Sequence, residues 1–270
     1  MKPKAHILLR VLPHYRSDAF AAGAEKLGYV PRITVSLQPG ECSREDAVVV
    51  WNLHGRGGIA KKVADDAGAP VIVAENGYVG KDKNDWQYYA VALDGHCGSG
   101  RWPDGGSERW EALRQTVAPW RDPPERGHVL ICGQRGIGSP EMASPRTFLE
   151  DTAAKIRKHT KYRVKERPHP GRVPNQCPLD EDLDAARLVV VWSSNVSSRA
   201  LLRGIPVMYC APHIITQGAA TKLDLSRVDD PPLPDRLPVF HRLAWAQWSV
   251  AEIASGLPMK LLLEQAGRSS

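Results

Sequence analysis

The stretch Arg187-Leu-Val-Val-Val-Trp-Ser-Ser-Asn-Val-Ser-Ser-Arg-Ala-Leu-Leu-Arg-Gly-Ile-Pro-Val207 contains the pattern that decides the fold. Val189–Trp192 is a continuous apolar run of strand length, which is typical of a parallel strand covered on both faces. A short helix is expected over 198–203, because Gly204 stops it and a new strand begins at Pro206. A strand, a helix and a strand in direct succession predict a parallel α/β sheet.

Small polar residues crowd the turn between the first of these strands and the helix. A helix N-terminus presents unpaired N–H groups and a partial positive charge, and serine hydroxyls add further donors. Such a turn suits a phosphate group, although a single serine there is more often only an N-cap. The residues of this turn that we expect to bind a ligand are Ser193, Ser194, Asn195 and Ser197.

A second loop of similar character lies upstream and reads Lys165-Glu-Arg-Pro-His-Pro-Gly-Arg172. It follows an amphipathic helix expected over 147–160 and a short strand expected over 162–165. Loops at the carboxyl ends of parallel strands are where open α/β sheets bind ligands. The side chains expected to face the same crevice as the serine turn are Arg167, His169, Pro170 and Arg172.

These two loops resemble the HP and SS motifs of GT-B-type glycosyltransferases, with His169-Pro170 and Ser193-Ser194 as the matching pairs. The nearest families are the bacterial sialyltransferase-like and capsular-polysaccharide Kdo-transferase families, and the phage DNA glycosyltransferases are a further compact GT-B group. The resemblance covers residues 127–215. It implies that both pairs contact the phosphate and ribose of a nucleotide sugar, and that Gly133-Gln134 is the turn that opens the donor domain.

The remainder of the chain alternates between strand and helix patterns, which predicts a parallel sheet with helices on both faces. The expected fold is therefore α/β, with two Rossmann-like lobes in a GT-B-like arrangement, a cleft between them and a C-terminal helical segment. We expect an acceptor-side lobe over 1–122, a nucleotide-sugar (donor) lobe over 123–235 and helices over 236–270 that pack back on the lobes.

Composition indicates an ordinary globular protein, with 42% apolar and 24% charged residues in a chain of 270. No apolar stretch approaches the roughly 20 residues that a membrane-spanning helix needs, and the first apolar run is too short for a signal peptide, so we expect a cytoplasmic protein. The net charge of +6 favours a partner rich in phosphate or acid, such as a nucleotide sugar, an anionic glycan or DNA.

The five cysteines are scattered, and they form no CxxC pair. No histidine cluster has the spacing of zinc ligands either. We therefore expect reduced thiols and no cofactor, with the nucleotide sugar acting as a substrate. A loop carboxylate could hold magnesium, but no pattern in the sequence indicates a metal site.

An inverting sugar transfer needs a general base that takes the proton of the acceptor hydroxyl. Glu75 is expected to close a buried strand over 70–74, and Asp94 and His96 lie in a glycine-rich loop that can approach a substrate closely. We expect the base among these three residues, with His54 and Asp18 less favoured. A retaining enzyme would need no such base, and the sequence leaves the stereochemistry open.

The function that these patterns favour is transfer of a sugar from a nucleotide sugar to a hydroxyl acceptor. The acceptor is either a polysaccharide intermediate or a hydroxymethylated pyrimidine in DNA. The glycine-bearing loop over 52–58 is expected to line the acceptor side. Two alternatives remain, a non-catalytic two-lobed protein that binds a nucleotide or phospholigand, and a sugar-nucleotide epimerase.

Overall fold

The computed structural model describes residues 2–9, 15–96, 98–137, 142–171, 174 and 177–268. The chain divides into two units, unit 1 comprising Met1–Leu113 with His241–Ser270 and unit 2 comprising Arg114–Phe240. The first border thus lies after Leu113 rather than after residue 122, and the second lies within helix α7 (Leu237–Ala246). The C-terminal segment from His241 belongs to unit 1.

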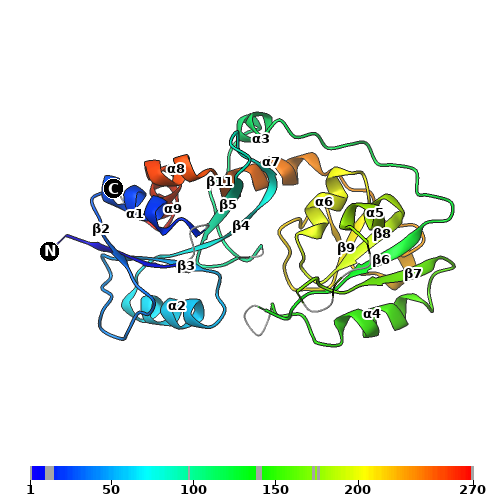
Figure 1. The fold of residues 1–270 in the computed structure, drawn as a ribbon, viewed down its shortest axis with the longest axis horizontal. Coiled ribbons are helices and arrows are strands. Elements are labelled where there is room, and N and C mark those ends of the chain that lie inside the picture. The colour runs from blue at the N-terminus through cyan, green and yellow to red at the C-terminus, as the bar shows by residue number, and fades with distance from the viewer. Residues whose placement is uncertain are drawn as a thin grey trace. The chain divides into compact units, whose positions relative to one another are not determined.

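Unit 1 is built on a six-stranded sheet in the order β11-β5-β4-β3-β1-β2 (Figure 1). Four neighbouring strands of this sheet run parallel, namely β2, β1, β3 and β4. Strand β5 runs antiparallel to both β4 and β11. The strands are β1 (Lys4–Leu8), β2 (Val30–Ile33), β3 (Ala47–Trp51), β4 (Val71–Lys81), β5 (Gln87–Leu93) and β11 (Gln247–Trp248).

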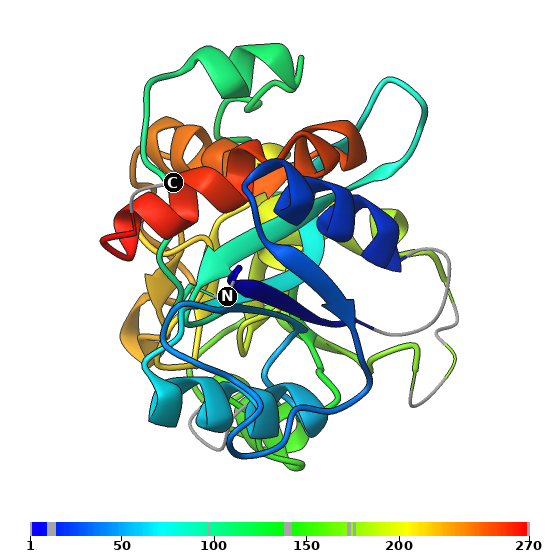
Figure 2. The ribbon, with the colours of Figure 1, turned by 90° about the vertical axis from the view of Figure 1, so that its left-hand side faces the viewer.

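Helices cover both faces of this sheet, as Figure 2 shows for α1 and α2. The helices of unit 1 besides α7 are α1 (Ser17–Lys26), α2 (Arg56–Ala67), α3 (Glu108–Ala112), α8 (Val250–Ser255) and α9 (Leu257–Gln265). Ile7 and Val49 face the layer of α1, α8 and α9, whereas Val48 and Val50 face α2. Because both faces are buried, the parallel strands read as continuous apolar runs.

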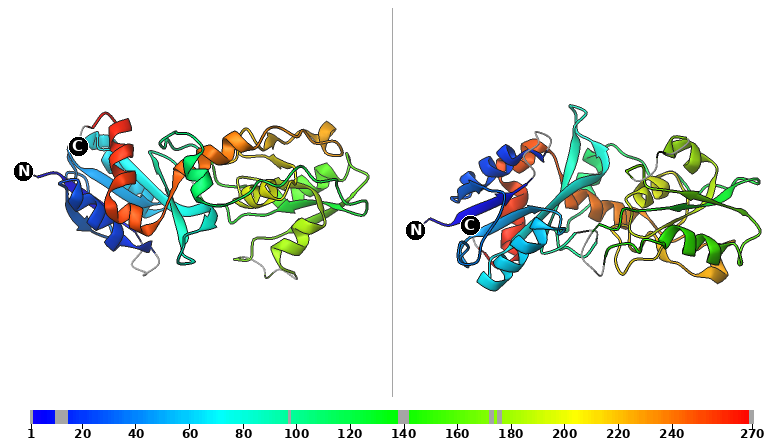
Figure 3. Two further views of the ribbon diagram at one scale, coloured as in Figure 1. Left: turned by 90° about the horizontal axis from the view of Figure 1, so that it is seen from above. Right: turned by 60° about the horizontal axis from the view of Figure 1, so that its bottom comes forward.

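The C-terminal helices dock on α1 through a glycine, and Figure 3 shows α1, α8 and α9 side by side. A Cβ atom added at Gly23 would lie 2.3 Å from the carbonyl oxygen of Ile253, so any larger residue would push α8 away. The close backbone approach explains why this helix carries a glycine in its interior, where glycine is otherwise unfavourable.

Strand β4 extends past the parallel sheet because a side chain from β11 satisfies its backbone. The register between β4 and β5 shifts between Asn76 and Lys81. The fully buried Gln247 accepts hydrogen bonds from the amides of Tyr78 (2.8 Å) and Val79 (3.0 Å) and donates one to the Val79 carbonyl (2.6 Å). Backbone groups that lose their ladder partners at the irregularity are thus paired again.

The expectation that a strand ends at Ala74 is therefore wrong. Glu75 lies within β4, opposite Ala90 of β5. Strands β5 and β11 lie beyond this point, and the sequence patterns described above indicate neither of them.

Unit 2 is built on a five-stranded parallel sheet in the order β10-β9-β8-β6-β7. Its strands are β6 (His128–Cys132), β7 (Arg163–Arg167), β8 (Ala186–Val191), β9 (Val207–Tyr209) and β10 (Thr221–Lys222). Its helices are α4 (Phe148–Ile156), α5 (Leu179–Asp184), α6 (Val196–Leu202), the first part of α7 and the short 3-10 helix η2 (Leu225–Arg227). Helix α4 packs on one face, against residues such as Ile131 and Leu188, and α5 and α6 lie on the other (Figure 1).

The expected α/β class with two Rossmann-like lobes is thus confirmed. In the part of the chain that the structure describes, every helix is too short or too polar to cross a bilayer.

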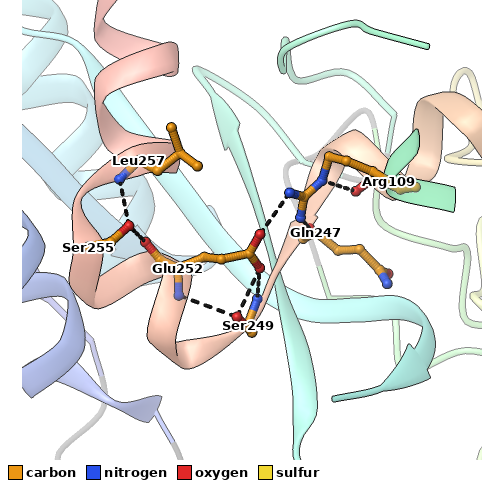
Figure 4. Close-up of polar contacts among 7 residues, drawn as sticks. Arg109, Gln247, Ser249, Glu252, Ser255 and Leu257 are labelled. Atoms are coloured by element: carbon orange, nitrogen blue, oxygen red, sulfur yellow. Dashed lines mark hydrogen bonds and ion pairs between the residues drawn. The ribbon is translucent and has the colours of Figure 1, made fainter. Parts of the chain in front are cut away.

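An ion pair joins α3 to the returning C-terminal segment of unit 1 (Figure 4). Arg109 contacts Glu252 at 2.7 Å, donates to the Gln247 carbonyl at 2.8 Å and stacks on the Trp248 ring, 3.7 Å from its centre. Glu252 also accepts from the amide and hydroxyl of Ser249, which caps α8. Burial opposes ionisation of Glu252, but the hydrogen bonds from Arg109 and Ser249 outweigh it and hold its pKa below the ordinary value.

Replacing Glu252 with Gln is expected to destabilise unit 1 by about 2 kcal/mol at neutral pH, the scale of a hydrogen bond to a charged group. Because the native pKa is lowered, this stability is present above the unfolded pKa of about 4.3 and is lost as the pH falls through the native value. Thermal melts of both proteins between pH 7 and pH 3 measure the difference.

The control is Glu264→Gln, which removes an exposed pair with Lys260 at 3.8 Å and should cost much less. A melting difference for Glu252→Gln that stays constant down to pH 3 would contradict the assignment.

Candidate functional site

The strand order of unit 2 reverses beside its first strand. From β6 the chain moves out to β7 on one side and then crosses to β8 on the other. The two connections leave in opposite directions, so the space beyond the carboxyl ends of β6 and β8 stays open, and open α/β sheets bind ligands at this point. The residues that follow these strands are Gly133-Gln134 and Trp192-Ser193.

Gln134 and Ser193 are hydrogen-bonded to one another across this point. The side-chain oxygen of Gln134 accepts from the amide of Ser193 at 2.6 Å, and its nitrogen donates to the Ser193 hydroxyl at 3.4 Å. The pair fixes the first residue of the serine turn against the end of β6. Because the Ser193 hydroxyl oxygen accepts from Gln134, its own hydrogen is directed elsewhere and suits a ligand oxygen.

The HP segment lies against the same strand end. The amide of Gly133 donates to the Arg167 carbonyl at 2.8 Å, and a Cβ atom at Gly133 would lie 3.6 Å from the His169 nitrogen. His169 Nδ1 accepts from the amide of Gly171 at 2.9 Å, so the neutral ring carries its proton at Nε2. Pro170 is exposed in this turn. The structure thus brings the segments of Gly133, Gln134, His169 and Ser193 to one edge of the sheet.

The serine turn ends earlier than expected, because α6 begins at Val196 rather than at residue 198. Ser194 Oγ accepts from the Val196 amide at 3.3 Å. Asn195 occupies the N-cap position without a side-chain bond to a helix amide, and its side-chain oxygen accepts from the Ser198 hydroxyl at 2.6 Å. Ser197 therefore lies inside the helix with a fully buried side chain, which contradicts its expected contact with a ligand. Ser193, Ser194 and Asn195 remain in the turn.

Arg167 neutralises a buried carboxylate instead of facing the crevice. It contacts Asp182 at 2.5 Å, and Lys165 pairs with the same carboxylate. The Asp182 side chain is only 2% exposed, and although burial opposes its ionisation, hydrogen bonds from Lys165 and Arg167 lower its pKa. Arg172, expected beside it, lies outside the described residues.

Arg135 is a cation of this edge, in the turn after Gln134 whose place directly behind the strand predicts that it frames the donor. Its side chain is exposed, and its Cδ atom would be 3.4 Å from a Cβ atom at Gly171, next to the His169 ring. The same loop is tied across to β8, since the Trp192 indole donates to the Met142 carbonyl at 2.8 Å.

Unit 1 has the same kind of reversal, between β1 and β3. A hollow of about 400 Å³ opens at the carboxyl ends of these strands. Among the described residues, its lining comprises Leu8, Leu9, Thr34, Val35, Trp51, Asn52, His54, Gly55, Arg56 and Gly57. The glycine-bearing loop over 52–58, which we expect to line the acceptor side, therefore contributes residues to this hollow.

Local geometry explains the composition of this loop. Asn52 has a left-handed backbone (φ 54°), and its side chain accepts from the His54 amide at 2.9 Å. A Cβ atom at Gly57 would lie 2.1 Å from the Asn52 carbonyl oxygen, so the first turn of α2 can pack here only with a glycine.

Of the three expected bases, Glu75 lies at this edge. It follows Ala74, whose carbonyl accepts from the Asn52 amide at 3.0 Å, and its carboxylate accepts a hydrogen bond from the Tyr78 hydroxyl. The side chain is half-buried.

Asp94 and His96 lie at the opposite edge, which disfavours their expected role. They follow β5, and because β5 runs antiparallel to β4, its end meets the start of β4. The Asp94 amide accordingly donates to the Val71 carbonyl at 2.8 Å. Asp94 pairs with Arg101 at 2.7 Å, and His96 is buried with 7% exposed.

No family model matches the chain, and no curated protein does. Among solved structures, the chain is similar to the Thermosulfurimonas dismutans KpsC beta Kdo 2,4 transferase, with a TM-score of 0.56, 14% identity and 90% of each chain covered. It is also similar to the beta Kdo 2,7 transferase of the same protein, with a TM-score of 0.55, 13% identity, and coverage of 95% of this chain and 98% of that one. The resemblance to capsular Kdo transferases is thus confirmed at the level of the fold.

Replacing Gln134 with Leu is expected to free the Ser193 amide and leave it without its acceptor, a loss of about 1–3 kcal/mol of local stability. Hydrogen exchange followed by mass spectrometry should then show at least about tenfold faster exchange in a peptide spanning 190–195. Gln134→Glu keeps the accepting oxygen and serves as the control. Equal exchange in the wild type and Gln134→Leu would show that the bond does not hold the turn.

Proposed function

We propose that the chain is a glycosyltransferase that moves a sugar from a nucleotide-sugar donor to a hydroxyl acceptor. The observation that carries this proposal is the convergence of the HP and SS segments at the strand-order reversal of unit 2. The fold shared with two proteins named as Kdo transferases supports it.

We assign the donor site to unit 2. His169 Nε2 and the Ser193 hydroxyl are donors suited to phosphate and ribose oxygens, and Ser194 and Asn195 extend this set. Arg135 supplies positive charge where the leaving phosphate gains negative charge, as such a transfer requires. Gln134 positions Ser193 and touches no substrate in this assignment.

We assign the acceptor to the hollow of unit 1, whose volume of about 400 Å³ falls within the range of small-molecule sites. Arg56 is the only permanently charged side chain among its described lining residues. The two neighbours are named for 2,4 and 2,7 Kdo linkages, the notation for bonds between sugars, and on this ground we favour a glycan acceptor over hydroxymethylated DNA.

Glu75 is the base that we propose for an inverting transfer, with His54 of the same edge as the second candidate. The Tyr78 hydroxyl holds the Glu75 carboxylate in one orientation. In a retaining transfer neither residue would remove a proton. A Glu75 variant with unchanged turnover would therefore favour a retaining mechanism.

The donor site is tested by thermal shift with UDP-, GDP-, dTDP- and CMP-linked sugars, Kdo included. A ligand at a hundred times its Kd stabilises the native state by about 2.7 kcal/mol. We expect one nucleotide class to raise the Tm, and His169→Ala to remove most of that shift. His159→Ala, at an exposed position elsewhere in unit 2, should keep it. No shift with any nucleotide would overturn the donor-site assignment.

The chemistry is tested by following sugar transfer to glycan and DNA acceptors with mass spectrometry. Glu75→Gln should lower kcat by about 10²- to 10⁴-fold, the usual contribution of a general base, while the nucleotide-induced Tm shift stays. Binding without turnover in the wild type would indicate the non-catalytic binding protein. Conversion of the donor sugar without any acceptor would indicate the epimerase.

A further inference from the structure

A buried carboxylate in unit 1 has no cationic lysine or arginine partner among the described residues. Asp46 is 4% exposed and precedes β3. It accepts from the Lys4 amide (2.6 Å), the Ser43 amide (2.8 Å) and the Ser43 hydroxyl (2.9 Å). Three hydrogen-bond donors around a carboxylate favour its charged form. A buried charge is normally paired or bound to a metal.

Unit 2 has a buried carboxylate in the corresponding connection, and there two cations neutralise it. Asp182 lies in the connection between the second and third strands of its sheet, as Asp46 does in unit 1, and each connection carries one cysteine, Cys177 and Cys42. Asp182 is paired with Lys165 and Arg167. Asp46 instead faces His6, whose Nε2 lies 3.7 Å from the carboxylate.

His6 and Cys42 complete a group of three possible metal ligands. The ligand atoms of His6, Cys42 and Asp46 all lie within 4.8 Å of one another. His6 is 6% exposed, and its Nε2 has no hydrogen-bond partner among the described residues. An imidazole nitrogen without a hydrogen-bond partner can act as a metal ligand, and the half-buried Cys42 thiol can do so once it has lost its proton.

We propose that His6, Cys42 and Asp46 bind a Zn²⁺ ion. Imidazole nitrogen, thiolate sulfur and carboxylate oxygen are the three donor types that zinc prefers, and the ligand atoms of a tetrahedral zinc ion lie about 3.5 Å apart. Binding releases the Cys42 proton to solvent and places the ion's positive charge beside Asp46. Water takes the fourth position, and the hydrogen bonds from Ser43 orient the Asp46 ligand.

The position of the site indicates that the ion holds two segments of unit 1 together. In unit 2 the connection between the second and third strands contains helix α5, whereas residues 34–46 of unit 1, all of them described, contain no helix. The ion would tie this helix-free connection to β1 through His6. The site lies away from the carboxyl edge of the sheet, so the inference does not depend on the proposed function.

The test is a titration of the full chain with Co²⁺ after dialysis against a chelator. We expect one equivalent to produce a sulfur-to-cobalt charge-transfer band in the near ultraviolet together with the visible bands of tetrahedral Co²⁺, and Zn²⁺ to abolish both. Zn²⁺ should also raise the Tm of the metal-free protein, because a ligand that binds only the native state stabilises it.

Variants distinguish this site from adventitious binding. Cys42→Ser should lose the charge-transfer band, and Asp46→Asn should weaken Co²⁺ binding at least tenfold. Cys210→Ser, a half-buried cysteine of unit 2, should retain both properties of the wild type. No charge-transfer band in the wild type, or an undiminished band in Cys42→Ser, would overturn the proposal. Circular dichroism of each variant shows whether it is folded.

Discussion

The reversal of strand order beside the first strand of each sheet is the constraint on which the rest of the structure depends. Crossovers between parallel strands are right-handed, so a chain that extends its sheet in both directions must leave the first strand on opposite sides. The carboxyl ends of β6 and β8 in unit 2, and of β1 and β3 in unit 1, are open for this reason. This opening determines where the serine turn, the HP segment and the loop over 52–58 lie.

The sequence was sufficient for the parts of the fold that local pattern controls. Buried parallel strands appear as apolar runs, and the rule that their carboxyl ends share an edge was enough to predict that the segments of His169 and Ser193 meet. Strand direction is not encoded locally, and this is why Asp94 and His96 were expected at the wrong edge. Ser197 was misplaced because the helix begins two residues earlier than the apolar pattern indicated.

Long-range polar partners were the other part that the sequence could not show. Gln247 satisfies the β4 backbone from 168 residues away, and Asp182 removes Arg167 from the expected phosphate site. Each is a buried polar group that must be paired, but its partner is chosen by tertiary packing. Asp46 is also buried, but it has no lysine or arginine partner among the described residues. The zinc site proposed there rests on the nearness of His6 and Cys42 in the fold, which the spacing of cysteines and histidines along the sequence does not show.

A crystal structure of the chain with the nucleotide that gives the largest thermal shift tests the donor-site assignment most directly. We expect a phosphate within hydrogen-bonding distance of the Ser193 hydroxyl and His169 Nε2, with the Gln134–Ser193 bond intact. A nucleotide bound in the hollow of unit 1, or at the amino edge of either sheet, would contradict the assignment, and the HP and SS segments would then be features of the fold alone.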